Sequence, residues 1–319
     1  MQQSKFRRGR FRDASGTAQM GVGRNMIGGW QTNRESAIKG MLFMVMFGVL
    51  WALIEFLGQA MPGGISAYQV VWSRYLLHLL LTLGLLFLVE GRPAIQSKHL
   101  GIQLARSGMM LIMPVAFICA AALAPQSSVL SVLWVAPLLV MILDRVFRKT
   151  RVAISAWLAT TLCLGGTLIL LQPDLKMVNT STAWSLAAAL SLALYLVLTT
   201  RIRDDSVWVS LFYTGLVPFA VLSFVMPAVW TAVTPRAALL LIAIGGIGWI
   251  ALLMLDKSIR HLEPAHGAIF MFVQLLATHV IFRASVNIYA ILGIGLIVVG
   301  LGMAAARGAR AAGVDPSSR

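Results

Sequence analysis

The chain has 319 residues, of which 59% are hydrophobic and only 12% are charged, and its mean hydropathy is +0.84. Soluble domains carry about twice this fraction of charged residues, so the composition excludes an ordinary water-soluble enzyme or binding domain. The net charge of +15 does not indicate a nucleic-acid-binding protein, because the basic residues gather at the ends of apolar stretches and in alternate loops.

Ten apolar stretches follow one another from Ile38 to Ala305, with short loops between them. A helix needs about 20 apolar residues to cross a hydrocarbon core of about 30 Å, and backbone in lipid must form its hydrogen bonds internally. The sequence therefore predicts an all-α polytopic membrane protein with ten transmembrane helices and little chain left for a soluble catalytic domain. The predicted spans are 38–58, 68–89, 102–122, 127–146, 152–172, 182–200, 207–229, 236–256, 264–282 and 286–305.

The two ends of the chain are polar. Residues 1–37 are basic, Gly-rich and poor in large aliphatic side chains, which predicts a disordered tail. This segment does not resemble a cleavable signal peptide, because the first apolar stretch begins too late and runs too long. Residues 306–319 are predicted to form a short polar tail after the last span.

The basic residues predict the orientation, because Lys and Arg are retained on the cytoplasmic side of a membrane. If the chain has ten spans, 21 of the 26 Lys and Arg residues fall on one side of the membrane, in both tails and in every second loop. Three fall on the other side, namely Lys176, Arg236 and Arg283. The remaining two, Arg74 and Arg106, lie within spans. We therefore predict a multi-pass protein of the cytoplasmic (inner) membrane with both termini in the cytoplasm.

The two halves of the chain share weak features in the same order. Pro125 precedes the fourth span and Pro264 precedes the ninth, 139 residues later, and small residues match between ATTLCLGG in span five and GIGLIVVG in span ten. We predict two five-helix repeats, 38–172 and 173–305. Because five is odd, the second repeat is inverted in the membrane, which is a recurring arrangement in secondary transporters with a site between the halves.

The last span carries two pairs of glycines at a spacing of seven residues, Gly293 with Gly300 and Gly295 with Gly302. Each pair shares one helix face, and such faces let two helices approach closely in lipid. Two interpretations stay open for them, which are packing within the bundle and a contact between two copies in a homodimer.

The ten spans in two inverted fives, with LxP before spans four and nine, resemble the drug/metabolite transporter (DMT) superfamily and its EamA-type branch in particular. VWSRYLLHLLL around Arg74 is similar to that family's second-helix arginine segment, WVAPLLV to its fourth-helix proline segment, and GIGLIVVG to its last-helix glycine segment. The resemblance covers nearly all of 38–305, although Lys149-Thr150 and Arg283-Ala284 stand where the family often has a Gly-Glu pair. It implies a ten-helix carrier, and it leaves open which of the family's varied substrates this chain moves.

Charged side chains within spans are rare and usually face a cavity or a partner. Glu55 lies late in span one and Arg74 early in span two, so both are expected near the same membrane face. They form either an ion pair that substrate or a proton opens during transport, or a static pair that fixes the first helix against the second. If Arg74 does not contact Glu55, Glu55 is the candidate site of proton coupling. His78 shares the helix face of Arg74, one turn later.

Aromatic side chains with polar tips suit a substrate cavity and can hold a cation over the ring, whereas core packing or lipid contact is the alternative for any single ring. For each lone histidine the alternative is a hydrogen-bonded core residue. Besides Glu55, Arg74 and His78, the candidates for substrate binding or coupling are Trp51, Trp134, Tyr195, Tyr213, Trp249, Gln274 and His279.

Three further charged residues lie near the ends of spans. Arg106 starts span three and is expected to extend toward the lipid headgroups. Asp144 and Asp256 end spans four and eight, beside Arg145 and Lys257, and are expected to form interfacial pairs with these neighbours. No spacing typical of a metal site and no nucleotide-binding signature occurs, so we predict no metal, no cofactor and no ATP drive.

Together these features predict a secondary transporter that moves a small organic metabolite (an amino acid, an amine or a drug-like solute) by alternating access, as an exporter or exchanger. The alternative is a flippase of the same fold for a lipid or lipid-linked substrate. A membrane-embedded lipid-modifying enzyme is disfavoured, because the acidic residues form no DDxxD-like or Ser/His/Asp group. The expected partners are the solute, the bilayer and, through Glu55, a proton.

Overall fold

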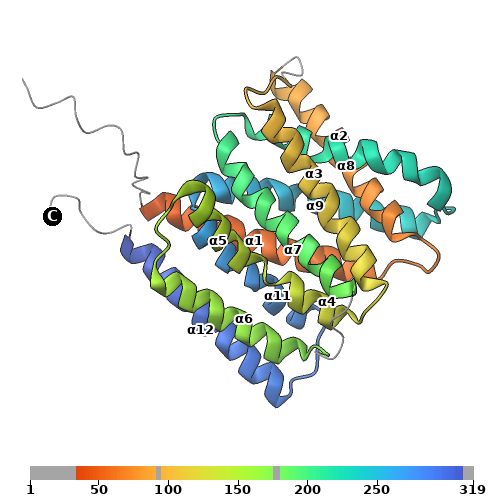
Figure 1. Ribbon diagram of the computed structural model, residues 1–319. Coiled ribbons are helices and arrows are strands. Elements are labelled where there is room, and N and C mark those ends of the chain that lie inside the picture. The colour runs from red at the N-terminus through yellow and green to blue at the C-terminus, as the bar shows by residue number, and fades with distance from the viewer. Residues whose placement is uncertain (1–33, 91–94, 175–179, 312–319) are drawn as a thin grey trace, which may run out of the picture. The chain divides into compact units, whose positions relative to one another are not determined.

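The structure is a computed structural model that describes residues 34–90, 95–174 and 180–311. Within these ranges it is helical with no strand, and ten helices are long and apolar enough to cross a membrane, which confirms the predicted fold class (Figure 1). Eight spans are unbroken: α1 (Arg34–Gln59), α2 (Ala67–Glu90), α3 (Leu100–Ala121), α6 (Ile154–Leu171), α7 (Thr180–Thr199) with the 3-10 turn η1 (Thr200–Ile202), α8 (Val207–Val229), α9 (Pro235–His261) and α12 (Ile288–Ala311).

The fourth and ninth spans are broken. The fourth consists of α4 (Gln126–Leu133) and α5 (Ala136–Arg148), and the ninth of α10 (Pro264–Gly267), the 3-10 segment η2 (Ala268–Phe272) and α11 (Val273–Ile281). In the fourth span the break directly precedes Pro137, which has no N–H to donate to the carbonyl of Leu133 and clashes with it.

The first and last helices extend beyond the predicted spans. The first helix already begins at Arg34, and its exposed Glu35 lies in the first turn, where a negative charge complements the helix dipole. The last helix continues to Ala311 through a segment rich in Ala and Arg, which are good helix formers. The rest of the predicted basic tail, residues 1–33, the end of the C-terminal tail, 312–319, and Lys176 lie outside the described residues.

Helices from the first and second halves of the chain alternate in the bundle. The longest helix contacts pair α1 with α9, α3 with α7, α2 with α8 and α6 with α12 (Figure 1). Further contacts join α2 to α9 and α3 to α8, and the broken spans pack against α1 and α7. The centre of the bundle is therefore built from both halves of the chain.

The contact between α6 and α12 depends on glycine. A Cβ atom on Gly166 would lie 2.6 Å from the carbonyl oxygen of Gly293, and one on Gly300 would lie 2.5 Å from Sγ of Cys163 and 2.7 Å from the carbonyl oxygen of Ala159. The Gly293 and Gly300 face thus packs within the bundle. The other predicted face, Gly295 and Gly302, is exposed, and a Cβ atom on either glycine would have no neighbour within 4 Å, so its role in a homodimer stays a prediction.

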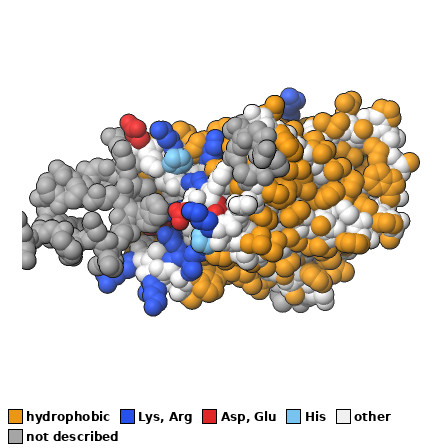
Figure 2. All heavy atoms as spheres, turned by 90° about the horizontal axis from the view of Figure 1, so that it is seen from above, with side chains coloured by type: hydrophobic (Ala, Val, Ile, Leu, Met, Phe, Trp, Pro, Cys, Tyr) orange, Lys and Arg blue, Asp and Glu red, His pale blue; other side chains and the backbone are white. Residues whose placement is uncertain are grey.

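One end of the bundle gathers the basic loops. Arg201 donates to the carbonyl oxygen of Phe147 at 3.2 Å, and Arg260 donates to the carbonyl oxygens of Arg203 and Asp205 at 2.8 and 2.9 Å, so loops far apart in sequence meet there. We call this the basic end. Figure 2 shows charged and His side chains gathered toward one end of the visible face, whereas hydrophobic side chains cover most of the rest.

We predict that Gly300→Ala lowers the thermal stability of the protein by about 1–3 kcal/mol, because the new methyl group has no room against α6. Thermal unfolding of the purified protein in detergent measures this change. Gly302→Ala is the matched control, since it adds the same methyl group to the same helix in open space. Equal stability of the two variants would contradict close packing at Gly300.

Candidate functional site

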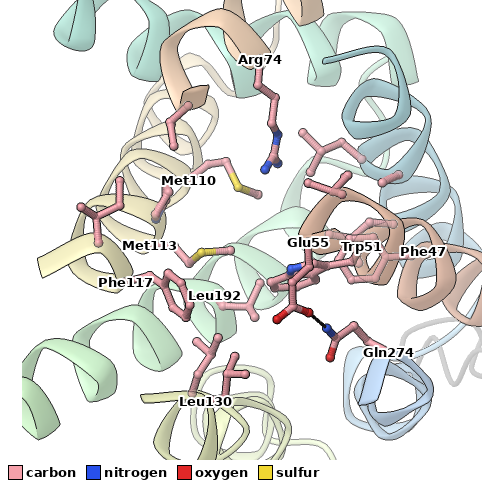
Figure 3. Close-up of a pocket in the computed structure, with 18 of the residues that line it drawn as sticks. Phe47, Trp51, Glu55, Arg74, Met110, Met113, Phe117, Leu130, Leu192 and Gln274 are labelled. Atoms are coloured by element: carbon pink, nitrogen blue, oxygen red, sulfur yellow. Dashed lines mark hydrogen bonds between the residues drawn. The ribbon is translucent and has the colours of Figure 1, made fainter. Parts of the chain in front are cut away.

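A cavity of about 210 Å³ lies inside the bundle, and its volume is well above the roughly 10–15 Å³ that one water molecule requires. Its lining residues come from α1, α2, α3, α4, α7, α9 and α11, so both halves of the chain contribute (Figure 3). Apolar and aromatic side chains form most of the wall. The charged side chains that line it are Glu55 and Arg74.

Glu55 is held by three donors. Its Oε1 accepts a hydrogen bond from Nε2 of Gln126 at 2.8 Å, and its Oε2 accepts from Nε2 of Gln274 at 2.7 Å (Figure 3) and from Oγ1 of Thr278 at 3.2 Å. The carboxylate therefore joins α1 to the start of α4 and to α11. Gln126 is the first residue of α4, and the loop before it lies at the end of the bundle away from the basic loops. The contact with Glu55 therefore lies toward the end of the bundle opposite the basic end.

Arg74 extends from α2 toward the cavity and meets no carboxylate (Figure 3). Among the described residues no ion pair includes Arg74, and its buried Nε has no hydrogen-bond partner. Its guanidinium carbon lies 5.4 Å from the ring centroid of Tyr75. The pair that we considered from the sequence, Glu55 with Arg74, is therefore not formed in this structure, although both residues line the same cavity.

Three other predicted candidates line the cavity, namely Trp51, Trp134 and Gln274. The rings of Trp51 and Trp134 are 6.2 Å apart, and Trp134 also packs 5.5 Å from Phe272. The indole N–H of Trp134 is buried without a hydrogen-bond partner. Nε2 of Gln274 donates to Glu55 and to Thr278, which leaves its Oε1 buried and unpaired.

The remaining five candidates do not line this cavity, because the rotation of each helix turns them elsewhere. His78 is fully buried against α8, where it bonds the carbonyl oxygen of Leu211 at 2.8 Å. Tyr213 donates to the carbonyl oxygen of Ile95, and Trp249 donates to Thr82. The other two are Tyr195, which packs beside Arg106, and His279.

The expectation that Arg106 extends toward lipid headgroups is wrong. Its side chain is 0% exposed, and it forms a 3.2 Å ion pair with the equally buried Asp256. Six hydrogen bonds surround the guanidinium, and its carbon lies 5.0 Å from the ring centroid of Tyr195. The acceptors are Tyr195, Thr199 and Asp256 on one nitrogen and Gln103, the carbonyl oxygen of Ser210 and Thr214 on the other.

The pairs expected from neighbouring residues are also corrected. Asp256 pairs with Arg106 and, at 2.8 Å, with Arg260 one turn later, rather than with Lys257. Asp144 likewise pairs with Arg148 at 2.8 Å and not with Arg145. In a helix, side chains four residues apart lie on one face, whereas adjacent residues point in different directions, and this geometry decides both cases.

The ion pair continues into a polar cluster at the basic end. Asp205, in the loop before α8, accepts hydrogen bonds from Ser97, Gln103 and the backbone N–H of Lys98. Burial alone would raise the pKa of Asp205, but these hydrogen bonds stabilise its ionised form and hold the pKa below its usual value. We call Arg106, Asp256 and the polar groups that bond them the inner cluster.

Sequence reasoning missed Gln126, Thr278 and, apart from Tyr195, the inner cluster as parts of the site. Thr278 follows Gln274 by one helical turn, and this spacing was a usable signal once Gln274 was a candidate. The pairing of Arg106 with Asp256 spans 150 residues and has no local signal. Among the described residues, no three His, Cys, Asp or Glu side chains are arranged to hold a metal ion.

Comparison with known proteins adds to this geometry. Residues 38–172 match the model of the EamA-like transporter family. A solved crystal structure, described only as that of a protein, is similar over 87% of this chain and 99% of its own, with a TM-score of 0.72 and 17% sequence identity, which supports the fold alone. No curated protein matches the sequence. The match over residues 38–172 agrees with the resemblance predicted from the sequence, and together with the ten apolar helices of the described residues it supports a membrane transporter of the drug/metabolite transporter type.

Proposed function

We propose that this protein is a secondary transporter that carries a small organic metabolite across the cytoplasmic membrane by alternating access, with both termini in the cytoplasm. The observation that carries the proposal is one cavity between helices of both halves, with a separate set of polar contacts toward each end of the bundle. A carrier needs this arrangement, because each set must close the path to one side while the other opens.

The outer set is centred on Glu55. It joins α1 and α4 of the first half to Gln274 and Thr278 on α11 of the second half. Gln126 is exposed and the contact involves one carboxylate, so few bonds must break for these helices to separate. Glu55 has no cationic partner among the described residues, so protonation removes a charge that the hydrogen bonds alone stabilise. This supports Glu55 as the coupling residue.

The inner set is the inner cluster. Arg106 on α3 of the first half bonds α7, α8 and α9 of the second half through Thr199, Thr214 and Asp256. Met110, one turn after Arg106, and Leu255, directly before Asp256, both line the cavity. The cluster therefore lies between the cavity and the basic end, where it blocks passage until α3 moves away from these three helices.

The helix contacts support the proposal of two inverted repeats. If the five spans of the first half are exchanged in order for those of the second, the pair α1–α9 becomes α7–α3, and α2–α9 becomes α8–α3. The exchange leaves the pairs α2–α8 and α6–α12 unchanged. The same exchange relates the broken fourth span to the broken ninth. Two units of matching shape can rock about the shared contacts α2–α8 and α6–α12.

Glu55→Gln is expected to abolish the dependence of transport on a pH gradient and to leave the fold intact, because the amide cannot be ionised. The measurement is flux into vesicles that contain the purified protein, for a panel of amino acids, amines and sugars, with and without the gradient. Glu35→Gln, an exposed site on the same helix, is the control. Unchanged pH-driven flux in the Glu55 variant would remove Glu55 from coupling, and no saturable flux of any solute would favour the flippase.

Arg106→Met is expected to destabilise the protein by about 3–5 kcal/mol, because it leaves Asp256 buried with only one of its two cationic partners. Thermal unfolding in detergent reports this loss. Arg236→Met, at an exposed position on α9, removes the same charge where no ion pair exists among the described residues and should change stability little. A small effect of Arg106→Met would show that the inner cluster does not hold the helices together.

Single cysteines that replace Arg201 and Arg283, in a background without Cys119 and Cys163, test the orientation. Both arginines are exposed, at the basic end and in the loop after α11 respectively. A membrane-impermeant thiol reagent should label the cysteine at 283 in intact cells and the one at 201 only after the membrane is opened. Labelling of both from one side would contradict the proposed topology.

A further inference from the structure

Arg74 is a charged group at the cavity that the structure leaves unpaired. No carboxylate of the described residues lies within 4.0 Å of its guanidinium, and its Nε is buried without a partner. The Nε of Arg106 also lacks a partner, but its two terminal nitrogens reach six acceptors within the same bundle, which is the contrast with Arg74. Removing a cation from water without a partner is costly, so a ligand that brings a negative charge to Arg74 gains the interaction that the protein omits.

The packing around Arg74 directs its side chain toward the cavity. Its stem lies against α9 at Gly248, where a Cβ atom would come within 3.0 Å of Nε and 3.2 Å of Cδ. Tyr75 next to it is fixed by a 3.0 Å hydrogen bond to the carbonyl oxygen of Met110. The guanidinium thus extends past a glycine that leaves it space, and Figure 3 shows the Arg74 side chain directed toward the cavity.

Glu55 does not offer an equivalent place for a cation. Both of its oxygens already accept hydrogen bonds, from Gln126 on one and from Gln274 and Thr278 on the other. A carboxylate has about four acceptor positions, so three are filled by the protein itself. Arg74, for which no hydrogen bond or ion pair is found among the described residues, is therefore the charged group of this cavity with the most hydrogen-bonding positions open to a solute.

The rest of the wall suits an apolar body. In the view of Figure 3, Met110 and Met113 lie at heights between Arg74 and Glu55, and Phe117, Leu192 and Leu130 line the wall beside and beyond Glu55. Thioether and aromatic side chains adapt to flat or branched hydrocarbon groups, and they offer no hydrogen bond to a sugar-like solute.

From these observations we propose that the transported solute is an organic anion with an apolar body, whose carboxylate pairs with the guanidinium of Arg74. The planar fork of an arginine matches the two oxygens of a carboxylate, which gives a charge-assisted bidentate contact. This inference rests on the proposed function, in that the cavity is the transport site, and it narrows the solute class from metabolites of either charge to anions.

The test uses four compounds with the same phenylpropyl frame and different head groups: 3-phenylpropanoate, 3-phenylpropanamide, 3-phenylpropylamine and phenylalanine. Their affinities for the full-length protein in detergent are measured by calorimetry at pH 7. We expect the anion to bind at least about tenfold more tightly than the amide or the amine, since a hydrogen bond to a charged group contributes about 1.5–3 kcal/mol. Preference for the amine, or no binding of any of the four compounds, would overturn the proposal.

Arg74→Met is expected to lower the affinity for the anion about tenfold and to leave that for the amide unchanged, because it removes the charge and keeps the apolar stem. Arg74→Lys should retain part of the preference, and Arg236→Met, at an exposed site, all of it. An unchanged ratio of anion to amide affinity in Arg74→Met would contradict the role of Arg74. Tighter binding of phenylalanine than of 3-phenylpropanoate would reveal a second subsite that binds the ammonium group and would overturn the assignment of a simple anion.

Binding and flux separate this inference from the proposed function. If 3-phenylpropanoate binds selectively but no flux of it into vesicles is measured, the anion site is supported and the proposed transport function is contradicted. Saturable flux that does not distinguish the anion from the amine would retain transport and overturn the anion site.

Discussion

The whole structure depends on the cost of placing charge in a hydrocarbon environment. Backbone groups meet this constraint through helices, and buried charged side chains meet it through partners on the same helix or on other helices. Arg106 and Asp256 satisfy it most fully, because both are 0% exposed and the arginine donates six hydrogen bonds. One arginine thereby ties one helix of the first half to three helices of the second.

The same constraint gives the two sides of the cavity different characters. The contact at Glu55 consists of one carboxylate with amide and hydroxyl donors, whereas the inner cluster contains charges of both signs that are fully buried. Arg74 lines the same cavity as Glu55, and among the described residues it forms no ion pair and its Nε has no hydrogen-bond partner. Arg106 is therefore a structural charge that holds helices together. Arg74 faces the cavity, and its charge is available to a ligand.

Much of the fold could be predicted from the sequence, because span length and hydropathy are local properties. Ten spans and the alternation of basic loops follow from short segments. Five of the ten predicted site candidates line the cavity, namely Glu55, Arg74, Trp51, Trp134 and Gln274, and their roles stay predictions. The other candidates, such as His78 and Trp249, failed to reach it because the rotation of a nearly uniformly apolar helix about its axis leaves no pattern in the sequence.

The sequence by itself determined ten segments long and apolar enough to cross a membrane, which the described residues form as helices, and the small number of charged residues within them, since both follow from residue type and distance along the chain. Only the tertiary structure decided which of those charges meet. Arg106 finds Asp256 at a separation of 150 residues, and Arg74 finds no carboxylate at all among the described residues. The physical reason is that a partner is chosen by how helices pack and rotate against one another, which depends on glycine contacts such as those at Gly248 and Gly300 and not on any single segment.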